Sequence, residues 1–157
     1  MKKIIYFFIF TFFLSIISFA DEKNIRVIDG DTIHIGKLKY RFFGIDAPET
    51  KQICEKDNIK IKCGVIAKNV LKNKIGDKIP ECVVKDKKDR YQRLVAECFI
   101  GKESLSKFMV REGYAVAYTQ YSKDFIEDEK YAKKNKLGIW SMTFQIPSEY
   151  RKSLRNK

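Results

Sequence analysis

The order of the predicted elements assigns this chain to the α+β class. Two observations support that assignment. Short β-branched stretches fill the first third of the chain after an apolar leader, and segments with apolar residues at helical spacing alternate with further strands later on. The 137 residues that follow position 20 suffice for one domain with a normal core, and no repeat or linker indicates a second domain.

Three strands are expected first. Residues 24–29 are apolar and β-branched, residues 32–35 alternate polar with apolar, and residues 38–44 form the third strand. Glycine-containing bends separate these strands, and Pro48 then ends the sheet.

The second half mixes helices and strands. Residues 64–75 place apolar side chains at helical spacing with lysines on the opposite face, which predicts a helix. Residues 79–85 and 94–100 form a second hairpin around a polar turn. A second helix is expected over residues 104–112, closed by Gly113, and a third is capped by Ser122 and runs to about Lys136. Residues 137–140 are expected to form an apolar latch. Residues 151–157 are basic and are expected to form a frayed end.

Three strands, a helix, two strands and two helices follow one another in this prediction. Five short strands with a helix inserted after the third also match an OB-type barrel, a fold often used to bind nucleic acids.

The first 20 residues are expected to be a secretory signal and not part of the fold. Lys2 and Lys3 precede a long apolar stretch, and small residues at positions 18 and 20 favour cleavage after Ala20. An uncleaved membrane anchor is the alternative, because the stretch reaches the short limit of about 17 residues for a bilayer span. The predicted localisation is therefore secreted or periplasmic.

The charge is strongly positive. Thirty-two Lys and Arg residues against 20 Asp and Glu residues give a formal net charge of +12. Such an excess indicates an anionic partner: nucleic acid, an anionic polysaccharide or an anionic membrane surface. Charge alone does not choose among these three.

Four cysteines follow the leader, which suits an oxidising compartment and allows three pairings. Cys54 and Cys63 flank a short charged loop, whereas Cys82 and Cys98 are equidistant from the centre of the second hairpin. This symmetry favours the pairs Cys54–Cys63 and Cys82–Cys98. Zinc is the competing interpretation, but the chain has no Cys-x-x-Cys and its single histidine, His34, lies in a predicted strand.

Three short segments together fit one chemistry. Asp31 and Asp46 offer carboxylates to a hard cation, Glu49 offers a base, and Arg41 and Arg93 offer guanidinium groups to a phosphate. Hydrolysis of a phosphodiester needs this set, because its transition state is anionic and water is a poor nucleophile. Each residue alone has an ordinary explanation as a turn former or a solvated side chain, so their joint occurrence carries the hypothesis.

The mature chain resembles the staphylococcal nuclease family over nearly its whole length. Five features occur in the family's order: Asp-Gly-Asp-Thr, Arg-x4-Asp-x-Pro-Glu-Thr, Tyr-x-Arg, the run from Gly113 to Tyr118, and Leu-x-Ile-Trp. The paired cysteines resemble a secreted bacterial branch. This resemblance implies a five-stranded OB barrel with three helices, and calcium-dependent endonuclease activity on DNA and RNA that leaves 3′-phosphate ends.

The resemblance also implies roles for single residues. Asp31 and Asp46 would ligate Ca²⁺ together with the backbone carbonyl of Ala47, where the family has threonine. Asp29 would support a water or the orientation of Asp31. Glu49 would be the catalytic base, and two arginines would bind the scissile phosphate: Arg41 and Arg93.

The nucleotide pocket follows from weaker matches. Arg90 and Tyr91 match positions near the substrate phosphate, Tyr118 matches a tyrosine that contacts the base, and Tyr121 is a looser match. Gln92 stands where the family commonly has glycine, so a positive φ at this position would strain the turn that presents Arg93.

Two other functions remain open from the sequence. One is a non-catalytic OB-fold module that binds nucleic acid, and the other is a basic adhesion protein that binds polysaccharide or lipid. Complete retention of the five charged residues favours the nuclease. The sequence implies DNA and RNA as partners, no protein partner, and a monomer.

Overall fold

The computed structural model describes residues 24–156, so the predicted signal segment lies outside the described residues. Within residues 24–156, no helix is both long and apolar enough to cross a membrane.

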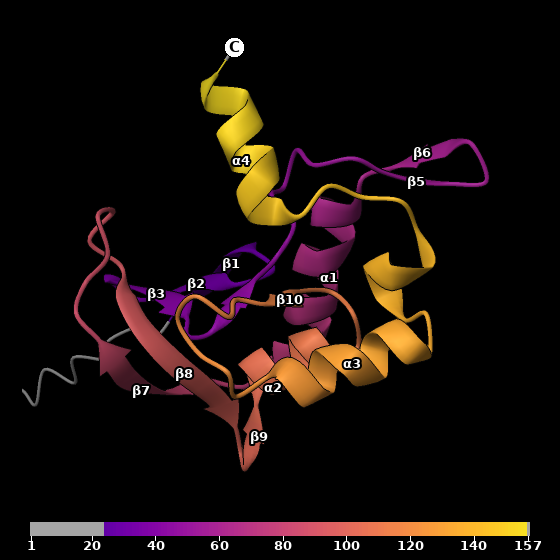
Figure 1. Ribbon diagram of the computed structural model, residues 1–157. Helices are drawn as coiled ribbons and strands as arrows, with labels where there is room; N and C mark the ends of the chain where they lie inside the picture. The colour runs from indigo at the N-terminus through magenta and orange to yellow at the C-terminus, as the bar shows by residue number, and fades with distance from the viewer. Residues whose placement is uncertain (1–23, 157) are drawn as a thin grey trace, which may run out of the picture.

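A mixed sheet forms one side of the fold (Figure 1). Its strand order is β1-β2-β3-β8-β7, and β9 pairs with β8; the β3–β8 pair is parallel and the other pairs are antiparallel. The bounds are β1 Ile25–Asp29, β2 Thr32–Ile35, β3 Leu38–Phe42, β7 Glu81–Asp86, β8 Leu94–Ile100 and β9 Glu103–Ser104.

The third strand is shorter than predicted. β3 ends at Phe42, and the chain bends at Gly44, whose φ is +71°. A Cβ at this glycine would collide with the Phe125 ring, so the bend needs both the left-handed backbone and the missing side chain. Beyond the bend, β4 (Ile45–Asp46) leaves the main sheet and pairs with β10 (Val116–Ala117).

The predicted closed five-stranded barrel is therefore wrong in closure and in strand number. Among the described residues, β1 pairs only with β2 and β7 only with β8, so the two edges of the main sheet do not join. The bend at Gly44 sends the chain to β10 instead of extending β3, which creates a separate two-stranded ladder. The α+β class is confirmed.

A second feature that the sequence analysis missed is a small hairpin of β5 (Cys54–Lys56) and β6 (Ile59–Ile61). Its two turn residues, Asp57 and Asn58, both have positive φ, as a two-residue turn between twisted strands requires. The Cys54–Cys63 disulfide joins this hairpin to the first helix, and Cys82–Cys98 links opposed positions of β7 and β8. Both predicted pairings are confirmed.

Three helices agree broadly with the prediction: α1 (Cys63–Ile75), α2 (Leu105–Arg111) and α3 (Ile126–Lys134). The cap of α3 is Phe125, three residues after the expected cap Ser122, whose hydroxyl instead accepts a hydrogen bond from the Asp124 N–H in a turn before the helix. The predicted latch is a short 3₁₀ turn, Gly138–Ser141, whose Trp140 packs against a small core around Cys54, Val116 and Ile139.

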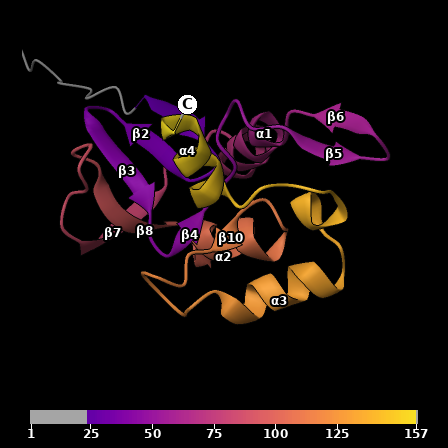
Figure 2. The same ribbon diagram turned by 45° about the horizontal axis from the view of Figure 1, so that its top comes forward.

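The C-terminal segment is a fourth helix, α4 (Pro147–Arg155), and not the frayed end that was predicted. Proline at the first helical position suits a helix start, because its missing N–H would have no helical partner there. Only Pro147 of this helix is buried. Figures 1 and 2 show α4 standing apart from α2 and α3, and Figure 2 shows it near β4.

The main core lies between the sheet and the helices α1 and α2. It consists of fully buried apolar side chains from both layers, including Ile33, Phe42, Leu71, Leu105 and Met109. Polar residues of the candidate site lie where this core reaches the surface, at the ends of β2, β3 and β8.

Candidate active site

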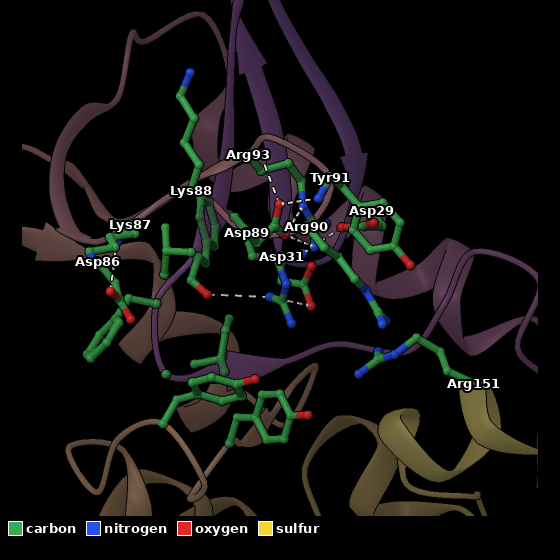
Figure 3. Close-up of a pocket in the computed structure, with 18 of the residues that line it drawn as sticks. Asp29, Asp31, Asp86, Lys87, Lys88, Asp89, Arg90, Tyr91, Arg93 and Arg151 are labelled. Carbon is green, nitrogen blue, oxygen red and sulfur yellow. Dashed lines mark hydrogen bonds and ion pairs between the residues drawn. The ribbon is translucent and has the colours of Figure 1, made fainter.

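One cleft of about 730 Å³ collects most of the predicted site residues (Figure 3). They come from strand ends, from the loop before β8 and from the segment after β10. The predicted residues that line the cleft are Asp31, Arg41, Glu49, Arg90, Tyr91, Arg93, Tyr118 and Tyr121. Asp46 and Ala47 are buried beside it.

Strand register brings the first charged residues together. Thr32 of β2 lies opposite Arg41 of β3, and Arg41 lies opposite Val95 of β8. Asp31 immediately precedes β2, and Arg93 immediately precedes β8. The three neighbouring strands therefore deliver Asp31, Arg41 and Arg93 to one edge, as the sequence predicted.

Arg41 bridges the two predicted metal ligands. Its Nη1 lies 2.8 Å from Asp31 Oδ2 and its Nη2 lies 3.0 Å from Asp46 Oδ1. Asp31 Oδ2 also accepts the Ala47 N–H at 2.7 Å, and Asp31 Oδ1 accepts the Thr32 hydroxyl at 3.0 Å. Two nearly inaccessible carboxylates are thus held within the span of one guanidinium group.

Asp29 forms part of the same acidic cluster. Its Oδ1 accepts the Asp31 N–H at 3.1 Å. Burial, followed by the negative charge of Asp31, raises the pKa of Asp29 to about 7. This crowding of negative charge gives the cluster an electrostatic reason to attract a cation.

Glu49 lies on the loop after Pro48, and the loop is clamped by a buried glutamine. The Glu49 N–H donates to Gln52 Oε1 at 3.3 Å, and the Gln52 N–H donates back to the Glu49 carbonyl at 2.7 Å. Gly64 at the start of α1 also packs against the Glu49 backbone, where a Cβ would overlap the Glu49 carbonyl. The backbone of Glu49 is therefore fixed, while its side chain remains 36% exposed.

Arg93 is held by a residue that the sequence analysis did not single out. Asp89 Oδ2 accepts from Arg93 Nε at 2.8 Å and from Nη2 at 2.7 Å. Asp89 Oδ1 accepts the N–H groups of Tyr91 and Arg93, and Arg93 Nη1 donates to the Thr32 hydroxyl at 3.0 Å. The signal was present in sequence, since aspartate often accepts N–H groups from the residues that follow it in a turn.

The concern about Gln92 is justified by the structure. Gln92 has a φ of 61°, in the left-handed region that favours glycine. The turn forms nonetheless, because the Asp89 carboxylate and carbonyl accept the N–H groups of Tyr91, Gln92 and Arg93.

The predicted substrate residues lie on two sides of the cleft. Arg90 and Tyr91 are on the loop before β8, with the Arg90 guanidinium 5.0 Å from the Tyr91 ring centre. Tyr118 and Tyr121 are on the opposite segment, in edge-to-face contact with ring centres 4.8 Å apart. The Tyr121 N–H donates to the Tyr118 carbonyl, and this turn places Tyr121, the weaker of the two family matches, beside Tyr118.

Arg151 is the major site residue that sequence reasoning missed. Its Nη1 lies 2.8 Å from Asp46 Oδ1 and 2.9 Å from Glu49 Oε1, and its Nη2 lies 3.0 Å from Asp46 Oδ2. Burial raises the pKa of Asp46, while Arg151 and Arg41 oppose that rise. Burial alone would lower the pKa of Arg151, but its bonds to Asp46 and Glu49 outweigh burial and raise it.

A hard divalent cation fits the donor chemistry of this cluster. Asp31 and Asp46 supply buried carboxylate oxygens, the ligand type that Ca²⁺ prefers, and the Ala47 backbone adjoins both. Across residues 24–156, no three His, Cys, Asp or Glu side chains form a complete metal site. A cation here would therefore depend on two carboxylates, with backbone, water or substrate oxygens completing its shell.

Comparison with known proteins gives a consistent family. The profile described as "Staphylococcal nuclease homologue" matches residues 39–142. The chain is 35% identical to a thermonuclease of Staphylococcus hyicus, over 76% of this chain and 75% of that protein. It is 32% identical to an uncharacterized endonuclease of Haemophilus influenzae, over 83% of this chain and 75% of that protein.

A third relative is much longer. Endonuclease YhcR of Bacillus subtilis is 34% identical in an alignment of 146 residues that covers 80% of this chain but 12% of YhcR. The likeness to YhcR therefore concerns a small part of that protein's length.

Proposed function

The chain belongs to the staphylococcal nuclease homologue family, and we propose that it is an endonuclease that hydrolyses phosphodiester bonds of DNA and RNA with calcium as its cation. One observation carries the proposal. Arg41 bridges the buried carboxylates of Asp31 and Asp46 at the edge of a basic cleft that also contains Glu49 and Arg93. A hydrolase acting on an anionic ester needs these groups together.

Two arginines are proposed to bind the scissile phosphate. Arg41 and Arg93 come from neighbouring strand ends, and each can present two N–H groups to phosphate oxygens. Both stay charged at any working pH, so they remain attractive as negative charge grows at phosphorus. Their bonds to Asp31 and Asp89 orient them before substrate arrives.

Glu49 is proposed to take the proton of the attacking water. Water adds to phosphorus, the bond from phosphorus to the 5′ oxygen breaks and that oxygen takes a proton from solvent, so the products are a 3′-phosphate and a 5′-hydroxyl. A positioned general base typically contributes about 10²–10⁴ in rate. Asp31, Asp46 and the Ala47 carbonyl would hold Ca²⁺, which would supply positive charge beside the phosphate.

Weak sequence preference is part of the proposal. Arginines that bind phosphates carry no base information, and stacking or edge contacts from Tyr118 and Tyr121 accept any base. We also propose export to the periplasm or medium, supported by the leader in the sequence and by two disulfides. A monomer suffices, because all the proposed groups come from one chain.

The first experiment is cleavage of single-stranded DNA by the purified protein in calcium or in chelator. Glu49→Gln is the test variant and Glu81→Gln is the matched control, since Glu81 is an exposed residue of β7 away from the cleft. Calcium-dependent cleavage that only Glu49→Gln loses would support the proposal. Binding without cleavage in calcium would refute it in favour of a nucleic-acid-binding module.

A further inference from the structure

Helix α4 places a second guanidinium group, after that of Arg41, on the carboxylates of the candidate site, and neither the motifs nor the proposed mechanism uses it. Figure 3 shows Arg151 reaching from α4 into the cleft, opposite the loop that carries Asp89 and Arg90. Its contacts are specific, because three hydrogen bonds of 2.8–3.0 Å join it to Asp46 and Glu49.

Arg151 uses the oxygens that a cation and a base would need. Asp46 Oδ1 accepts from both Arg41 and Arg151, whereas Asp46 Oδ2 accepts from Arg151. Glu49 Oε1 accepts from the same guanidinium. Withdrawal of Arg151 would therefore free an oxygen of the buried aspartate and an oxygen of the predicted base at once.

The rest of α4 is lightly attached. Pro147 is its only buried residue, and Leu154 on the last turn is 52% exposed. The segment before the helix is fixed more firmly, because the buried Gln52 side chain donates to the Gln145 carbonyl at 2.6 Å. This arrangement ties the start of α4 to the protein, and the body of the helix is held mainly by the three Arg151 bonds, beside a longer bond of 3.4 Å from the Tyr150 hydroxyl to the Lys51 carbonyl.

We propose that Arg151 competes with the cation within the same chain, and that docking of α4 sets the cation affinity of the site. This inference rests on the proposed calcium dependence. A guanidinium group and a divalent cation both neutralise Asp46, and their positive charges repel each other when both lie against its buried carboxylate. Cation binding therefore releases Arg151 from Asp46 and Glu49 and undocks the body of α4. Arg151 is a positioning residue in this scheme, acting through Asp46 and Glu49.

The test measures calcium binding without substrate, by titration calorimetry on the full protein. The variants are Arg151→Gln, Arg151→Lys and Lys152→Gln. Lys152 is the matched control, because it is exposed on the same helix and its replacement removes the same charge without touching Asp46. We expect Arg151→Gln to lower the calcium dissociation constant about tenfold, a change typical of losing charge-assisted hydrogen bonds. The calcium dissociation constant of Arg151→Lys should lie between those of wild type and Arg151→Gln, and that of Lys152→Gln should equal the wild-type value.

A second measurement needs no variant. Hydrogen exchange of the α4 amides is followed in wild-type protein with and without calcium, and we expect exchange to accelerate in calcium. Unchanged or slower exchange would overturn the proposal.

The outcomes separate this inference from the proposed function. Equal calcium affinities of wild type and Arg151→Gln, or weaker binding by the variant, would overturn the competition and leave the nuclease proposal standing. If Lys152→Gln bound calcium as tightly as Arg151→Gln, the competition would also be overturned, because the loss of any positive charge on α4 would then explain the higher affinity. No calcium binding by any of these proteins would refute the calcium dependence itself, and the inference with it.

Discussion

Replacement of Asp89 by alanine gives the sharpest test of how the site is organised. Asp89 accepts two hydrogen bonds from the Arg93 side chain and two from backbone N–H groups of the turn. We expect Asp89→Ala to lower kcat/KM through misplacement of Arg93 and to leave the overall fold intact.

The size of the effect follows from arginine's rotamer freedom. Holding a free arginine side chain in one conformation costs about 2 kcal/mol. The Arg93 contact with the Thr32 hydroxyl survives the change, so the expected loss is about 1.5–2 kcal/mol. That range corresponds to about a 10- to 30-fold lower kcat/KM.

The assay compares four proteins under single-turnover conditions: wild type, Asp89→Ala, Arg93→Ala and the double variant. Asp89 acts through Arg93, so its replacement should have little further effect once Arg93 is gone. Asp86→Ala is the matched control, because Asp86 lies on the same cleft and bonds only the Lys87 N–H. The reasoning would be refuted if Asp86→Ala were equally damaging, or if the Asp89 effect persisted without Arg93.

Three further predictions concern stability and placement. Gly64→Ala should lower the free energy of unfolding by about 1–3 kcal/mol and should also reduce kcat, because the added Cβ would displace the Glu49 carbonyl. A free energy of unfolding and a kcat near the wild-type values would contradict this packing. At position 92, where φ is positive, melting temperatures should fall in the order Gly, Gln, Val, and any other order would contradict strain at this turn. Burial tends to raise the pKa of Asp89, but its bonds from Arg93 and Tyr91 outweigh burial and lower it below 3.8. Asp89 therefore stabilises the fold above pH 3.8 and loses this contribution as pH falls further, so the stability gap to Asp89→Asn should shrink in acid denaturation curves.

The catalytic candidates were predictable because their spacing follows strand geometry. Asp31 immediately precedes β2, whose Thr32 lies opposite Arg41 of β3, so strand register brings Asp31 and Arg41 together. The disulfides were predictable for the same reason, since Cys82 and Cys98 face each other across β7 and β8. The local sequence pattern is sufficient to predict which residues lie together wherever those residues are on or next to neighbouring strands.

The open sheet was not predictable from local pattern. Residues 38–44 read as one strand, and only the contact between Gly44 and the distant Phe125 shows that the chain must bend there. The bend moves Asp46 into a separate ladder with Val116, which is why Asp46 is buried beside the cleft while Asp31 lines it. A contact between residues so far apart in sequence leaves no periodic signal.

Arg151 shows the same limit in a functional residue. Its surroundings in sequence are basic and polar, which is typical of a solvated end, and helix α4 has only one buried residue to reveal it. The signal that was available, Pro147 at a helix start, predicts a helix but not a partner. The partners, Asp46 and Glu49, come from β4 and its following loop, some hundred residues earlier, and only the tertiary fold brings the Arg151 side chain to these two carboxylates. A site rich in buried negative charge must find counter-charge somewhere in the protein, and here the last helix provides it.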